Sequence, residues 1–159
     1  MRSSVGLAFA VVTFAGVALA DSPHFNGAVA SVSGDGSLVV SFKEVGLGSN
    51  ANINFVASAD AVASYGCVNN GGKNPQASNK RAAGGPVTAP GTFSSGKNGS
   101  ITESLTLKPP PAPADFSCPG GQKSVLADVT YTNVSIKDTT TPVAQPIAGS
   151  FTKSFYTFK

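Results

Sequence analysis

Apolar and polar residues alternate along much of the chain, in the pattern that places successive side chains on opposite faces of a β-strand. Leu38, Val40 and Phe42 share one face of such a strand, and Val39, Ser41 and Lys43 lie on the other. Helix signals are nearly absent, and the turn-forming residues Gly, Ser, Asn and Pro recur at short intervals. The pattern predicts an all-β protein of short antiparallel strands.

Eight segments carry this strand signal and are separated by turn-forming residues. Their spacing of about 8 to 15 residues is typical of a single antiparallel β-sandwich of immunoglobulin-like build, and a closed barrel is the alternative. The chain contains no tryptophan, so it lacks the buried Trp of true immunoglobulin domains. The predicted strands are Phe25–Ser33, Leu38–Val45, Asn52–Ser58, Ala61–Val68, Val87–Phe93, Ser100–Leu107, Val125–Ile136 and Gly149–Phe158.

Two local features refine this strand prediction. Residues 33–37 have the sequence Ser-Gly-Asp-Gly-Ser and are expected to form a tight turn, because Asp-Gly tolerates positive φ angles. Within the predicted strand 125–136, the apolar set shifts phase by one residue between Tyr131 and Val134. Such a shift predicts a β-bulge, since one extra residue moves the following side chains to the opposite face.

Three segments are expected to be irregular or to lie at an edge. Residues 69–85 offer few apolar side chains to bury and are predicted to form a long surface loop. Pro90 favours an edge position for its strand, because proline donates no ladder hydrogen bond. The run from Pro109 to Pro113 must be stiff and extended, and we expect it to cross from one sheet edge to another. Recognition of this run by an SH3-like partner is the functional alternative.

The N-terminus has the three parts of a secretory signal peptide. Arg2 supplies the positive charge, residues 5–17 are apolar and uncharged, and Ala18-Leu19-Ala20 fits the cleavage site. A membrane anchor is the alternative, but an anchor needs about 20 apolar residues. We therefore predict a signal peptide over residues 1–20 and a secreted, extracellular single domain over residues 21–159, with no later membrane span.

The charges are sparse and mixed in sign. The formal net charge of +3 includes Arg2, which signal-peptide cleavage would remove. Lys80-Arg81 is the one adjacent pair of cationic residues, and it fits either a solvated loop or a secretory processing site. Such scattered charge argues against binding to nucleic acid, which requires a basic patch.

Two cysteines remain in the predicted mature chain. In an exported protein, Cys67 and Cys118 are expected to form a disulfide. Each stands alone, without the C-x-x-C spacing or nearby histidine of a metal or nucleophile pair, which is the rival interpretation. A closed loop of this length would contribute about 4 kcal/mol to stability in the loop-entropy model.

The sequence offers few groups for catalysis. His24 is the only histidine and lies near the predicted mature N-terminus, so a serine triad or a two-histidine copper site is not expected. Paired carboxylates are the remaining option. Glu103 has the same parity as Ile101 and Leu105, so it points toward the predicted core; we expect it at a sheet edge, with a site carboxylate as the alternative. No catalytic residue, metal or cofactor is predicted.

Several polar and aromatic residues are candidates for binding or modification. Tyr65 and the Asn69-Asn70 pair, with Glu103, are the residues that we consider as ligand-facing, for instance toward a sugar. Asn98 and Asn133 begin N-x-[ST] sequons and are candidate glycosylation sites in a eukaryotic host. Asn98 lies in a predicted turn, whereas Asn133 lies at the predicted bulge and is expected to be less accessible.

Five stretches together resemble a family of small secreted proteins of actinobacteria and filamentous fungi whose function is uncharacterised. They are residues 38–48, 71–75, 91–93, 116–122 and 129–134. The resemblance covers nearly the whole predicted mature chain. It implies export and a compact β domain, and it supplies no activity and no catalytic residues.

These observations favour a secreted, non-enzymatic protein that binds an extracellular protein or glycan, or associates with a surface. The first alternative is a cell-wall glycan-binding module or a carboxylate-dependent enzyme acting on glycans. A secreted effector or inhibitor of another protein is a further alternative.

Overall fold

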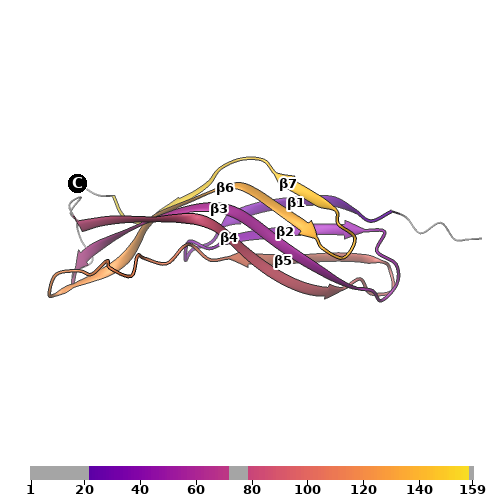
Figure 1. Cartoon of the computed structure of the whole chain (residues 1–159), viewed down its shortest axis with the longest axis horizontal. Helices are drawn as coiled ribbons and strands as arrows, with labels where there is room; N and C mark the ends of the chain where they lie inside the picture. Colours follow the sequence, from indigo (N-terminus) through magenta and orange to yellow (C-terminus); the bar gives the residue numbers. More distant parts are fainter. Residues whose placement is uncertain (1–21, 72–78, 158–159) are drawn as a thin grey trace, which may run out of the picture.

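The computed structural model describes residues 22–71 and 79–157, so the predicted signal peptide lies outside the described residues. The described chain is all-β, as predicted, and forms eight strands (Figure 1). They are β1 (His24–Val32), β2 (Leu38–Val45), β3 (Asn52–Asn69), β4 (Lys80–Ser94), β5 (Ser100–Leu107), β6 (Gln122–Asp138), β7 (Ala144–Ile147) and β8 (Phe151–Ser154).

The strands form two antiparallel sheets that pack as a sandwich. One sheet has three strands in the order β1-β2-β5. The other has five strands, in the order β4-β3-β6-β7, with β8 also paired to β6. The molecule is elongated because β3, β4 and β6 run along most of its length, whereas the three-stranded sheet covers only part of it (Figure 1). The predicted antiparallel β-sandwich is confirmed.

The core between the sheets follows from the alternating sequence pattern. The inward side chains of β2 are fully or almost fully buried, with Leu38 and Val40 at 0% exposure and Phe42 at 3%. Phe42 packs against Phe55 of β3, with ring centroids 4.7 Å apart. Phe25 of β1 also contacts both rings, so aromatic packing joins the two sheets near one end of the sandwich.

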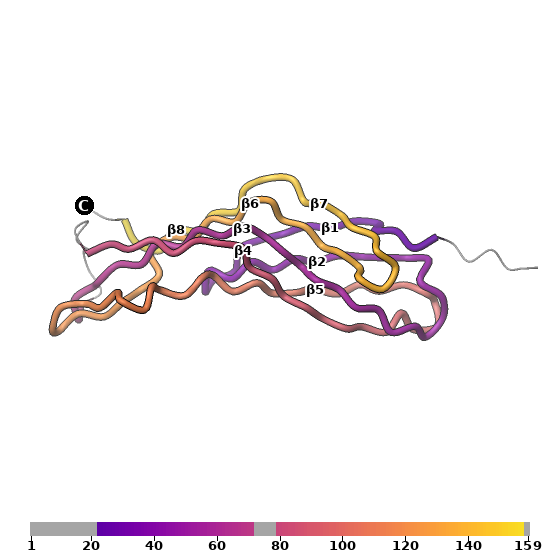
Figure 2. The backbone as a smooth tube through the Cα atoms, viewed as in Figure 1, coloured from indigo at the N-terminus to yellow at the C-terminus, as the bar shows by residue number. Residues whose placement is uncertain are grey.

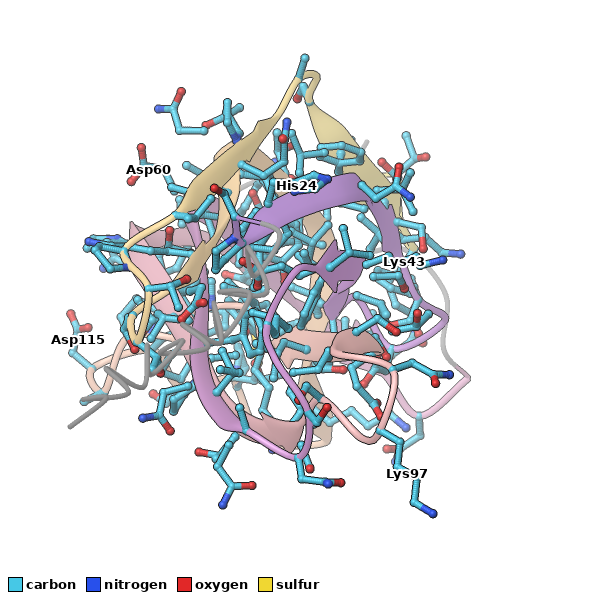
Figure 3. All side chains as sticks on the ribbon, turned by 90° about the vertical axis from the view of Figure 1, so that its right-hand side faces the viewer. His24, Lys43, Asp60, Lys97 and Asp115 are labelled. Atoms are coloured by element: carbon cyan, nitrogen blue, oxygen red, sulfur yellow. A yellow bond between two sulfur atoms is a disulfide. The ribbon has the colours of Figure 1, made fainter. Side chains whose placement is uncertain are left out.

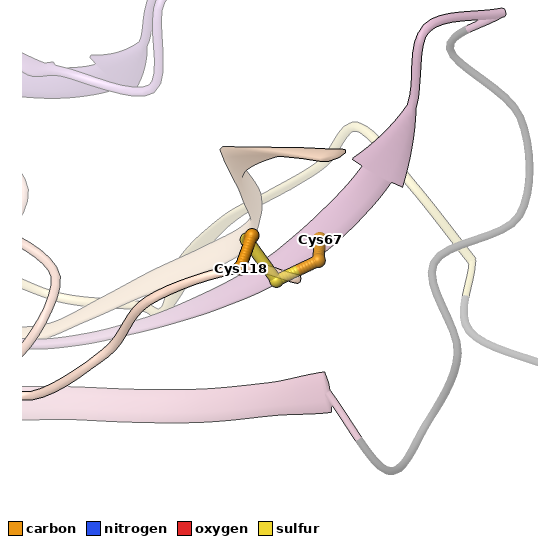
Figure 4. The surroundings of a disulfide bond; sticks show 2 residues. All are labelled: Cys67 and Cys118. Carbon is orange, nitrogen blue, oxygen red and sulfur yellow. A yellow bond between two sulfur atoms is a disulfide. The ribbon is translucent and has the colours of Figure 1, made fainter. Parts of the chain in front are cut away.

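The proline-rich segment, residues 108–121, runs along the half of the five-stranded sheet that contains Tyr65 and Cys67, and we call this segment the strap. The strap connects β5 of one sheet to β6 of the other, and β6 is an inner strand rather than the predicted edge. The hydroxyl of Tyr65 donates a 2.6 Å hydrogen bond to the carbonyl oxygen of Pro110. Cys67 and Cys118 form the predicted disulfide, which ties the strap to β3 (Figure 4).

The turn between β1 and β2 also packs on this half. Asp35 accepts hydrogen bonds from the Ser33 hydroxyl at 2.5 Å and from the amide and hydroxyl of Ser37, each at 3.0 Å, so the predicted tight turn is present. These bonds lower the pKa of Asp35 to about 2. Gly36 has a φ of 88°, and a Cβ there would lie 2.6 Å from Cδ2 of Leu126. Only glycine therefore fits both the conformation and the space.

The predicted bulge in the long strand is confirmed. Ser58 pairs with Ser135 and Asp60 pairs with Thr132, which leaves one more residue between the partners on β6 than on β3. Asn133 takes a φ of 51° there. Asparagine is one of the few non-glycine residues that adopt this left-handed conformation readily.

Three strand predictions were wrong in their extent. Segments 52–58 and 61–68 are one continuous strand, β3, because it pairs with β4 without a break from Asn52 to Gly66. Residues 80–85, predicted as loop, pair with β3, since a backbone ladder needs no apolar side chains. The last segment forms only the short β8, and the chain before it forms β7, which was not predicted.

Candidate functional site

Two loops and the adjoining ends of β2 and β5 line an open pocket at one end of the sandwich, which we call the loop-end pocket. The loops connect β2 to β3 and β4 to β5, and they lie at the same end of the molecule (Figure 2). The pocket has a volume of about 400 Å³. Its lining residues are Lys43, Val45, Gly46, Gly48, Ser49, Lys97, Asn98, Gly99 and Ser100.

Left-handed residues give the two loops their tight shape. Asn50 has a φ of 54°, and glycines hold the other left-handed positions. The φ angle of Gly48 is 74° and that of Gly99 is 63°. The two glycines face each other closely, since a Cβ on Gly99 would lie 3.2 Å from the backbone nitrogen and oxygen of Gly48. A side chain at residue 99 would push the loops apart.

Ser95 clamps the two loops together. This serine is 2% exposed, and its hydroxyl donates a 2.6 Å hydrogen bond to the carbonyl oxygen of Gly48. The same hydroxyl oxygen accepts a 3.0 Å bond from the amide of Ala51. Backbone bonds from Leu47 to Gly99 at 3.0 Å and from Asn50 to Gly96 at 2.6 Å add to the clamp. The pocket is therefore held in shape before any ligand arrives.

Two lysines supply the charge of this pocket. Lys43 comes from the outer face of β2, and Lys97 comes from the turn before β5. In the view along the molecule, Lys43 and Lys97 project to one side, and Asp60 and Asp115 project to the other (Figure 3). The remaining polar side chains of the lining are the hydroxyls of Ser49 and Ser100 and the amide of Asn98. This set of donors suits a polar ligand that carries negative charge.

A buried carboxyl group lies directly behind the pocket. Glu44 sits between Lys43 and Val45 in the chain, but its side chain enters the core and is 0% exposed. Neither carboxyl oxygen has a hydrogen-bond partner among the described residues. Burial, with the negative charge of Asp138, raises the pKa of Glu44 to about 7, and His24 acts weakly against this.

Asp138 is the second buried carboxyl group at this end and is also 0% exposed. Its Oδ1 accepts hydrogen bonds from the amides of Thr140 at 2.6 Å and Thr141 at 3.1 Å. Its Oδ2 accepts a bond from the hydroxyl of Thr141. Both carboxyl oxygens of Asp138 therefore accept hydrogen bonds from the turn that follows β6, whereas those of Glu44 accept none from the described residues.

Sequence reasoning did not single out Glu44 as a buried site residue, and it did not bring the two pocket loops together. For Glu44 a signal existed, because it continues the parity of Leu38, Val40 and Phe42 into the core. For the pocket no local signal exists, since its shape depends on contacts such as that of Ser95 with Gly48, 47 residues apart.

The residues proposed as ligand-facing are not brought together by the fold. Glu103 is exposed on β5, an edge strand of the three-stranded sheet, as the edge interpretation expected. Tyr65 is half-buried under the strap, and its hydroxyl donates a hydrogen bond to the carbonyl oxygen of Pro110. Asn69 and Asn70 are exposed at the far end of β3, away from the loop-end pocket. A shared site built from these four residues is not supported by their positions.

Both candidate glycosylation asparagines are exposed. Asn98 lies in the turn and lines the loop-end pocket. Asn133 is exposed at the left-handed bulge, and its lower accessibility relative to Asn98 stays a prediction. Its Nδ2 donates a 2.7 Å hydrogen bond to Asp60.

Over residues 22–71 and 79–157, no three His, Cys, Asp or Glu side chains are grouped so that they could hold a metal ion. Within the same ranges, no helix has the length and apolar character needed to cross a membrane. No family model matches the chain, and no curated protein or solved structure matches it either.

Proposed function

We propose that this protein is an extracellular, non-enzymatic binding protein that holds its partner at the loop-end pocket. The observation that carries this proposal is the pre-organised state of the pocket, in which the buried Ser95 joins the two loops. A rigid pocket loses little conformational freedom when a ligand binds, so more of the contact energy becomes affinity.

The chemistry of the lining supports binding rather than catalysis. Among the described residues, the pocket lining offers ammonium groups, hydroxyls, an amide and backbone groups. General acid–base catalysis needs a group that exchanges a proton near neutral pH within reach of the ligand. Glu44 titrates in that range but is enclosed in the core on the opposite face of β2.

The strand order supports an immunoglobulin-like build for the sandwich. The first, second and fifth strands form one sheet, and the third, sixth and seventh lie together in the other. Immunoglobulin domains divide their strands in a related way, and their binding loops cluster at one end of the sandwich. Here the fourth strand pairs with the third, and the β2–β3, β4–β5 and β6–β7 connections meet at the pocket end.

For the partner, we favour an acidic extracellular glycan. Lys43 and Lys97 supply positive charge for a carboxylate, and hydroxyl and amide side chains beside them match the hydrogen-bonding groups of a sugar. The predicted signal peptide, the disulfide and the resemblance to a secreted family are the support for an extracellular location.

Binding of the mature chain, residues 21–159, to a uronate polysaccharide and to neutral chitin, β-glucan and cellulose tests the proposal. We expect retention on the uronate polymer that weakens as salt increases and falls about tenfold in K43A/K97A. The matched control is K137A, which removes an exposed lysine on β6 outside the pocket. Equal binding by K43A/K97A and K137A would contradict the proposal.

An effector or inhibitor role predicts a different result. In that case the protein would bind none of the polysaccharides, and crosslinking in the native medium would capture a protein partner. A partner captured by the wild type but not by K43A/K97A would keep the pocket as the binding site and replace the glycan. Hydrolysis of any of the polymers by the purified protein would overturn the non-enzymatic part of the proposal.

A further inference from the structure

Glu44 is buried in the core at a point where its two chain neighbours line the loop-end pocket. Its neighbours in the chain, Lys43 and Val45, line the pocket, while its own side chain points into the core from the same stretch of β2. In the ladder it pairs with Phe25 of β1 and Ile101 of β5. Any movement of the Glu44 side chain therefore acts on backbone that shapes the pocket.

The surroundings of Glu44 favour a neutral carboxyl group. The paired residues on both neighbouring strands, Phe25 and Ile101, are apolar. The titratable groups that act on Glu44 are Asp138 of β6 and His24 of β1. Asp138 repels a second negative charge, and its oxygens already accept hydrogen bonds from the Thr140–Thr141 turn. No donor among the described residues bonds to an ionised Glu44 in its buried position.

We propose that Glu44 is a proton-binding site that controls the shape of the loop-end pocket. With a proton bound, its carboxyl group remains in the core and the end of the sandwich stays closed. Without the proton, the carboxylate is driven toward water, which requires the start of β1 or the 139–143 turn to move away. The proposal rests on the proposed function only in treating this pocket as the binding site.

The direction of the effect follows from the proton affinity of the folded chain. The pKa of Glu44 rises from an ordinary value of 4.5 to about 7 on folding. Between these two values, the folded chain keeps a proton that the unfolded chain has lost. The stability that this proton contributes to the fold is therefore fully present below pH 4.5 and is lost as the pH rises through about 7, by roughly two orders of magnitude in the folding equilibrium constant.

The sequence allows a direct measurement of this group. Glu44 and Glu103 are the two glutamates of the chain, so ¹³C labelling of glutamate side-chain carboxyls gives two signals. The E103Q variant removes the exposed one and assigns the other. We expect the Glu44 carboxyl to titrate with a midpoint near pH 7 in the wild type. A midpoint between pH 4 and 5 would overturn the proposal, and this measurement needs no variant at position 44.

Control of the pocket is measured separately, through the backbone amides of residues 43–46 and 97–100. In the wild type we expect their chemical shifts to follow the Glu44 titration, and in E44Q we expect that pH dependence to disappear. His24 also acts on Glu44, so H24Q is the matched control and should retain the dependence.

The outcomes separate this inference from the proposed function. Loss of the pH dependence in H24Q but not in E44Q would assign the effect to His24 and overturn the role of Glu44. Constant pocket amide shifts during a Glu44 titration near pH 7 would overturn control of the pocket. Neither result depends on the ligand, whereas a failure of K43A/K97A to alter binding affects the proposed function alone.

Discussion

The hydroxyl of Tyr131 donates a 2.8 Å hydrogen bond to the carbonyl oxygen of Gly36, a residue 95 positions earlier in the chain. Tyr131 is 0% exposed, so this bond fixes the β1–β2 turn against the long sheet from inside the protein. Burial raises the pKa of Tyr131 to about 12, which keeps the hydroxyl protonated as the donor.

Loss of this hydrogen bond should destabilise the fold. We expect Y131F to lower the free energy of unfolding by about 1 to 2 kcal/mol, since a buried carbonyl loses its donor. Chemical denaturation measures the change, and Y156F at the half-buried Tyr156 is the control, expected to change stability by less than about 0.5 kcal/mol. Equal effects of the two variants would argue against a structural role for the Tyr131–Gly36 bond.

The disulfide should be a major contributor to stability. Because the cysteines are 51 residues apart, C67A/C118A is expected to lose about 4 kcal/mol in the loop-entropy model. Denaturation with and without reductant should show the same loss for the wild type and no change for the variant. Intact-mass analysis should show two protons fewer in the oxidised protein, and two free thiols in the secreted product would contradict the assignment.

The stability of the protein should depend on pH through Glu44. Since folding raises the pKa of Glu44, E44Q should be more stable than the wild type above pH 7, by about 3 kcal/mol. Below pH 4.5 the wild-type carboxyl is neutral in both states, so this difference should vanish. Thermal unfolding at closely spaced pH values measures the curve, and parallel curves for the two proteins would exclude a titrating Glu44.

The Ser95 clamp should govern both stability and the pocket. We expect S95A to lose about 1 to 2 kcal/mol, because the Gly48 carbonyl and the Ala51 amide lose their shared partner. Ligand binding should weaken as well, since the loops lose their fixed shape. The neighbouring exposed Ser94 provides the control S94A, for which neither quantity should change.

Export makes a prediction at the N-terminus. The secreted protein is expected to begin at Asp21, because the predicted cleavage site ends at Ala20. N-terminal sequencing or intact mass of protein from the culture medium measures this. Replacing Ala18 and Ala20 with larger residues should leave the leader attached, and an unchanged N-terminus would contradict the predicted site.

The alternating pattern of the sequence was enough to find the strands whose side chains face one core. β2 has the predicted bounds Leu38–Val45, and β5 has the predicted bounds Ser100–Leu107. The phase change after Tyr131 located the bulge for the same reason, since the buried side chains must return to one face.

Strands held mainly by their backbone ladder left no such pattern. The first part of β4 contains Lys80, Arg81, alanines and glycines, and it is ordered by pairing with β3. The shape of the loop-end pocket could not be predicted either, because it depends on which distant loop Ser95 meets. Glu44 was visible in the alternation of β2, but its missing hydrogen-bond partners are a property of the assembled core.

The disulfide between the strap and β3 also determines how the chain carries tension. A force that separates the two ends of the protein passes along the covalent chain from β3 to the strap through Cys67 and Cys118, so the 50 residues between them cannot be extended by it. At about 3.4 Å per extended residue, the disulfide prevents the extension of roughly 170 Å of chain between the two cysteines. The loop-end pocket is built partly from residues inside this loop, Lys97 to Ser100, and partly from β2 outside it. Under load, the four lining residues from Lys97 to Ser100 would thus be shielded, whereas the five lining residues that precede Cys67 lie on the path of the force.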